Sequence, residues 1–267
     1  MNRALLAHTW RSQRVKLLIV CLGLGIWGAL FPIIYASFGE TFRELMGSGL
    51  IPEQLMEFGG GDVFSLSGSI ALGSIHPIAL VLNSIFAVGF AAAAVAGERQ
   101  SGTLEVVLAR PLSRRTLYWT LLAAAILFIA LSVGATIVGV LVGSAIAGVS
   151  GDLTADRLPL LGLNGVLLFG AIAAIGLAAS VSFDRLSPAL GITVGLVVVM
   201  YFLEVLGSFW PEAQFLQPYS LFHYYDPKSI LEGGAWAGDF AVLAVVATIA
   251  VAWALAVLPR RDLAAPS

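Results

Sequence analysis

The chain has 267 residues, of which 59% are hydrophobic and 11% are charged, and its mean hydropathy is +0.94. Since a soluble domain carries roughly 25% charged residues, this composition indicates an integral membrane protein. The 14 Lys and Arg against 16 Asp and Glu give a formal charge of −2, which argues against a nucleic-acid partner because such proteins need a basic face. One cysteine, Cys21, excludes an intrachain disulfide.

Six apolar segments are each long enough for a membrane-spanning helix, which needs roughly 20 residues to cross a hydrocarbon core of about 30 Å. The predicted spans are about 17–38, 70–96, 117–147, 160–182, 187–209 and 239–258. We therefore expect an all-α integral membrane fold in which residues 1–267 form a single domain. The first segment is too long for the core of a signal peptide and is predicted to be retained.

The distribution of positive charge predicts the orientation. All but three of the 14 Lys and Arg side chains lie in the N-terminal segment, in the loops after the second and fourth spans, or after the last span; the exceptions are Arg43, Arg157 and Lys228. Because cytoplasmic loops are enriched in Lys and Arg, both termini are predicted to be cytoplasmic. The opposite loops are acidic, which either keeps that surface solvated or attracts cations.

Small residues recur at helical spacing in two predicted spans. They are Ala135, Gly139, Gly143 and Ala147 in the third span, and Ser187, Gly191 and Gly195 in the fifth. Such stripes let helix backbones approach closely. The contact that each stripe makes lies either within one chain or between two chains.

The loop between the second and third spans has the pattern of a short amphipathic helix. Ser101 or Thr103 can cap its start, and Leu104, Val107 and Leu108 then fall on one face. A helix of this kind, held between two membrane helices, has the form of a docking element. The alternative is an ordinary connector whose arginines set the topology and contact anionic lipid headgroups.

Further residues bound this short helix. Pro111 is predicted to end it, because the residue before a proline avoids helical geometry, and Ser113 can cap the following helix. The residues that carry the whole pattern are Glu98, Gly102, Thr103, Leu104, Glu105, Leu108, Pro111, Ser113 and Arg114. This pattern resembles the loop between the second and third spans of ABC-2 type export permeases, the membrane-spanning halves of type-2 ABC exporters.

The resemblance implies a function and an assembly. In that family the loop forms a coupling helix that sits in a groove of a separate ATP-hydrolysing subunit, and the basic stretch 2–16 is placed like the family's interfacial helix. The implied complex contains two ATPase subunits, which bind ATP and Mg, and a second permease copy or a paralogue, in a prokaryotic plasma membrane. This chain is then expected to bind no cofactor, to export a substrate, and to be no enzyme itself.

The sequence agrees with an ATPase on another chain. A nucleotide-binding loop GxxxxGK[ST] needs a lysine after glycine, whereas Lys16 follows Val15 and Lys228 follows Pro227. The scattered histidines, His8, His76 and His223, fit neither a catalytic site nor a metal site.

A secondary transporter or channel without an ATPase partner is the alternative function, and such proteins place ionisable groups along their path. Glu204, in the fifth predicted span, is the candidate path-lining residue; it either faces the path or lies near headgroup level. The aromatic-rich loop that follows this span either packs at the membrane interface or forms a gate.

Overall fold

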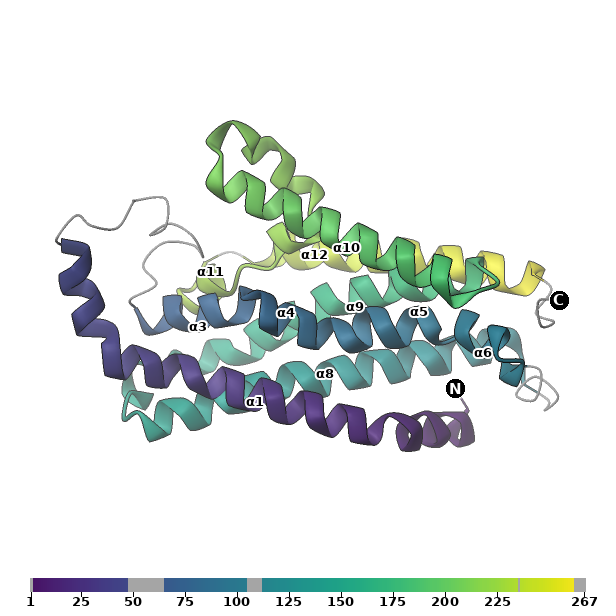
Figure 1. Ribbon diagram of the computed structural model, residues 1–267, viewed down its shortest axis with the longest axis horizontal. Helices are drawn as coiled ribbons and strands as arrows, with labels where there is room; N and C mark the ends of the chain where they lie inside the picture. Colours follow the sequence, from purple (N-terminus) through teal and green to yellow (C-terminus); the bar gives the residue numbers. More distant parts are fainter. Residues whose placement is uncertain (1, 48–64, 105–111, 235, 262–267) are drawn as a thin grey trace.

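The computed structural model describes residues 2–47, 65–104, 112–234 and 236–261. The elements described there are helices joined by short connections (Figure 1). Five of the described helices are long and apolar enough to cross a membrane, and a bent pair, 66–75 with 77–93, is a sixth candidate span if it is counted as one. The four that match the predicted spans closely are α8 (Arg114–Ile146), α9 (Leu158–Ser182), α10 (Leu186–Phe209) and α12 (Ala237–Val257). The prediction of an α-helical, multi-pass protein is confirmed.

The first span differs from its prediction because α1 is one continuous helix from Arg3 to Gly47. The basic stretch 2–16 is therefore the first part of that helix and no separate interfacial helix. Asn2 caps α1, since its Oδ1 accepts the N–H of Leu5 at 3.0 Å, and the Asn2 N–H donates to Oγ1 of Thr120 at 2.9 Å. Pro32 lies inside α1, and the helix changes direction toward its C-terminal end (Figure 1).

The second span was predicted as one helix over 70–96, and that prediction is wrong in detail. The chain forms α3 (Leu66–Ile75) and α4 (Pro77–Ser84), and the two halves of the span meet at 48°. His76 has ψ 139° because a residue before proline is excluded from helical geometry. A π-helical turn, η1 (Ile85–Phe90), follows, and then α5 (Ala91–Ala93) and α6 (Ala96–Gln100).

The helices pack around α9, which contacts α5, α8, α10 and α12. Packing of α1 against α8 uses the first small-residue stripe: a Cβ atom at Gly139 or Gly143 would collide with the backbone of Gly25 or Ala29. In contrast, Gly191 and Gly195 of α10 have no atom within 4 Å of where a Cβ would lie. The contact of the third-span stripe is therefore within the chain, whereas the fifth-span stripe is uncovered.

Short helices form the connections. One end of the bundle carries η2 (Ser150–Asp152), η3 (Ala155–Arg157), η4 (Pro211–Tyr219), η5 (Leu221–Tyr224) and α11 (Pro227–Leu231). The opposite end carries α6, the N-terminus of α1 and η6 (Leu258–Arg260) (Figure 1). The N-terminus of α1 and η6 thus lie at the same end of the bundle as α6, which leads into the loop that resembles a coupling helix.

A small cavity with a mixed lining lies beside the break in the second span. Its volume is about 20 Å³, and its lining includes Ser74, Asn83, Thr136 and Tyr225. This is room for about one water molecule. Asn83, one of the lining residues, accepts a hydrogen bond at its Oδ1 from Ser132 at 2.9 Å, so a hydrogen bond between α4 and α8 lies beside the cavity.

Candidate functional site

The helix α6 leads from the second span into the candidate coupling loop. The chain departs from ideal helix at Val95, where φ is −118° and ψ is −52°. The N–H groups of Val95 and Ala96 both donate to Oγ of Ser180 in α9, each at 2.9 Å. Ser180 is fully buried, where an unpaired N–H would be costly. Its hydroxyl therefore fixes the start of α6 against α9.

A glycine ends α6. Gly102 has φ +74°, a conformation that L side chains rarely adopt, and its N–H donates to the carbonyl of Arg99 at 3.1 Å. Thr103 and Leu104 are helical again. Gly102 therefore turns the chain between α6 and the segment in which the coupling helix is predicted.

Glu98 organises the exposed side of this turn. Its carbonyl oxygen accepts hydrogen bonds from the hydroxyls of Ser101 and Thr103 at 3.1 and 3.2 Å, and its carboxylate accepts a further one from Thr103. Leu104 is 1% exposed and packs in the main apolar core. The start of the loop is therefore anchored by Leu104 and presents Glu98 outward. Glu105, Leu108 and Pro111 lie outside the described residues.

Two residues hold the far end of the loop. Oγ of Ser113 accepts the N–H of Thr116 at 3.1 Å, so Ser113 caps α8 as predicted. The guanidinium of Arg114 donates to the carbonyls of Leu258 and Pro259 at 3.3 and 3.4 Å, and to that of Arg261. The first turn of α8 is therefore tied to the C-terminal segment.

Sequence reasoning did not single out Asp184, which lies in the three-residue connector between α9 and α10. Its Oδ1 forms ion pairs with both Arg99 and Arg261. Arg99 is 8% exposed, and a buried guanidinium needs a partner. In addition, Gln100 accepts the N–H of Leu186 at 2.9 Å. The sequence signal that could have identified Asp184 is the presence of an acidic residue in so short a connector between two spans.

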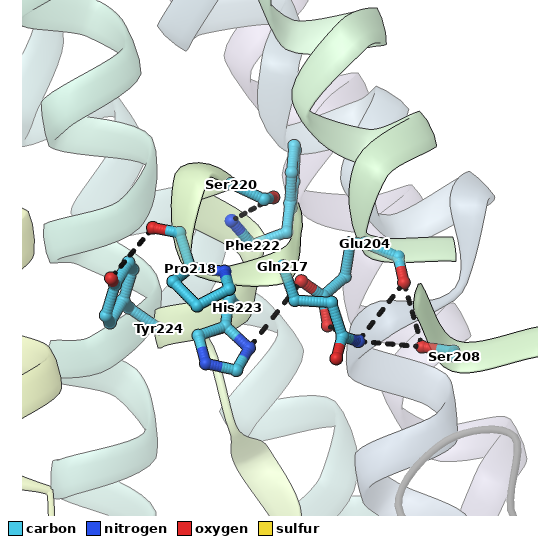
Figure 2. Close-up of polar contacts among 8 residues, drawn as sticks. All are labelled: Glu204, Ser208, Gln217, Pro218, Ser220, Phe222, His223 and Tyr224. Carbon is cyan, nitrogen blue, oxygen red and sulfur yellow. Dashed lines mark hydrogen bonds and ion pairs between the residues drawn. The ribbon is translucent and has the colours of Figure 1, made fainter. Parts of the chain in front are cut away.

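Glu204 lies at the opposite end of the bundle, and its side chain faces the connector after α10 (Figure 2). Its Oε1 accepts a hydrogen bond from Nε2 of Gln217 at 3.0 Å, and its Oε2 lies 3.8 Å from Nδ1 of His223. A Cβ atom at Gly207 would collide with Gln217, so glycine there lets η4 approach α10. Glu204 is thus engaged by η4 and η5.

These features define a multi-pass membrane protein with an anchored loop between its second and third crossings. The chain belongs to the ABC-2 family of transporter proteins, because the model of that family matches residues 7–263. No curated protein and no solved structure matches the chain significantly. Family membership supports a permease of an ABC transporter and implies association with an ABC ATPase partner. It favours this function over a secondary transporter or channel.

Proposed function

We propose that this chain is the membrane-spanning permease of an ATP-driven exporter and that residues 103–109 dock onto a separate ABC ATPase subunit. The observation that carries the proposal is the anchoring of the loop at both ends. Ser180 and Leu104 hold the side that leads from the second span, and the capped start of α8 holds the other. A force on the loop is therefore passed to both spans.

The burial of Leu104 refines which residues make the docking contact. A side chain that is 1% exposed anchors the loop from within, so the contact with the ATPase falls to Glu98, to Glu105 and to the apolar residue Leu108. Glu98 is exposed beside the turn at Gly102. In this proposal ATP and Mg bind on two partner ATPase subunits, both termini of the permease are cytoplasmic, and transport is outward across the cell membrane.

A second permease copy is proposed to pack against α10. The uncovered stripe of Ser187, Gly191 and Gly195 supports this contact, since all three residues are exposed and small residues favour close helix pairing in membranes. Only 11% of the most apolar stretch of α10 is buried within the described residues of one chain, so most of this stretch is open to a neighbour. The path for substrate then lies between the two copies, and Glu204 is placed at its outer end.

The docking test compares two charge changes at the same end of the bundle. Leu108→Asp should abolish co-purification of the ATPase, because it places a charge on the apolar docking face. Arg115→Ala changes an exposed charge at the start of α8 and should leave co-purification unchanged. Normal ATPase recovery with Leu108→Asp, at equal permease yield, would exclude the docking role.

A further inference from the structure

Both ends of the candidate coupling loop are connected to one short C-terminal segment. Before the loop, Arg99 of α6 pairs with Asp184, and the same carboxylate oxygen pairs with Arg261. After the loop, the guanidinium of Arg114 donates to three carbonyls of the segment, including that of Arg261. Segments far apart in sequence thus meet at one end of the bundle (Figure 1).

The C-terminal segment is itself well placed to resist displacement. Leu258 is fully buried in the main core, and η6 continues from α12 through Pro259. Side chains of Asp184 and Arg261 are 48% and 25% exposed, so water screens this pair in part. Arg99 is largely buried, and there the charge-assisted contact with Asp184 is stronger.

We propose that residues Leu258–Arg261 form a brace across the base of the coupling loop. In this brace Asp184 and Arg261 are positioning residues: they fix the spacing between α6 and α8, so that the second and third spans move together when the loop is displaced. The inference rests on the proposed function, because it assigns a mechanical role at the same loop.

The test measures the spacing between the two ends of the loop directly. Spin labels are attached to cysteines at the exposed positions Ser101 and Arg115, in a chain in which Cys21→Ser removes the native thiol. Distances are measured in the complex with its ATPase, without nucleotide and after trapping with ATP and vanadate. The unaltered brace should give a narrow distance distribution in both states.

Two variants weaken the brace. Arg261→Ala removes one arm and keeps the backbone carbonyl that Arg114 contacts, whereas Asp184→Asn weakens the pairs with both Arg99 and Arg261. Each variant should raise the fraction of molecules in which the two ends of the loop are separated. The expected rise is on the order of tenfold, which corresponds to the loss of one charge-assisted contact. If Asp184→Asn fails to fold, Arg261→Ala still tests the brace. Arg185→Ala, at the exposed neighbouring position, is the matched control and should keep the narrow distribution.

The outcomes separate this inference from the proposed function. ATPase should co-purify with both brace variants, because neither changes residues 103–109. A distance distribution that stays narrow in Arg261→Ala would overturn the brace. This holds even if the thermal stability of that variant falls, because the contact would then contribute to stability alone. Absence of an ATPase from the unaltered complex would instead contradict the proposed function.

Discussion

The hydroxyl of Ser180 accepts the backbone N–H of Val95 at 2.9 Å across the interface between α9 and the end of the second span. The adjacent N–H of Ala96 donates to the same oxygen, and Ser180 is fully buried. One side chain therefore satisfies two donors that the departure from helical geometry at Val95 leaves without helical partners. This contact makes α6 a continuation of the rigid bundle.

Ser180→Ala should destabilise the protein, because each buried N–H that loses its acceptor costs about 1–3 kcal/mol. The midpoint of thermal unfolding in detergent should fall, and hydrogen exchange should rise at Val95 and Ala96. Ser187→Ala, at an exposed position of α10, is the control and should change neither. An unchanged midpoint and unchanged exchange in Ser180→Ala would contradict the anchoring role.

Gly102→Ala should disturb the turn that leads into the coupling loop. A Cβ atom at φ +74° is strained by about 1 kcal/mol, so we expect weaker ATPase recovery at similar permease yield. Gly134→Ala is the control, because Gly134 lies inside α8 with no atom within 4 Å of the added carbon. Equal recovery from the two variants would show that the turn can relax without cost.

A larger side chain should have different effects in the two small-residue stripes, on the folding of each chain in α8 and on self-association in α10. Gly139→Leu should prevent stable folding of each chain, since an added side chain collides with the backbone of α1 at Gly25. Gly195→Leu should leave the thermal stability of each chain unchanged and weaken self-association, measured as disulfide cross-linking between copies through a cysteine at Ser187. Unchanged cross-linking in Gly195→Leu would place the second copy on another face.

Glu204→Gln should loosen the connector that follows α10. The variant removes the carboxylate that lies 3.8 Å from His223, while an amide can retain the contact with Gln217. Hydrogen exchange over η4 and η5 should therefore increase. The control Glu212→Gln changes an exposed carboxylate in η4 and should leave exchange as it is; equal exchange in both variants would argue that the pair does not hold the connector.

The sequence predicted the helical spans well because their signal is local. A long apolar run identifies a membrane helix, so the bounds of α9 and α10 differ from the predicted ones by two residues or fewer. The break at His76 was also encoded locally, since Pro77 follows it, but a hydropathy profile does not register it. The continuity of α1 through its basic first turns was missed because the resemblance implied an interfacial helix over 2–16.

The candidate site was predicted only in part, because its contacts join distant residues. The cap at Ser113 depends on neighbouring residues and was predicted from spacing. Gly102 was named only as part of the loop pattern, and the turn that it forms was not predicted. The pairing of Asp184 with Arg99 and Arg261 spans 85 and 77 residues, and no local pattern encodes it. Burial of Leu104 likewise depends on how the loop is seated on the bundle.

The measurement that tests the central claim most directly is purification of the tagged chain from its native membrane in mild detergent, with mass spectrometry and an ATPase assay on the eluate. We expect a stoichiometric ABC ATPase subunit and ATP hydrolysis, both lost in Leu108→Asp and kept in Arg115→Ala. Recovery of the chain without an ATPase subunit or ATP hydrolysis, under conditions that preserve a known ABC complex purified alongside it, would contradict the account.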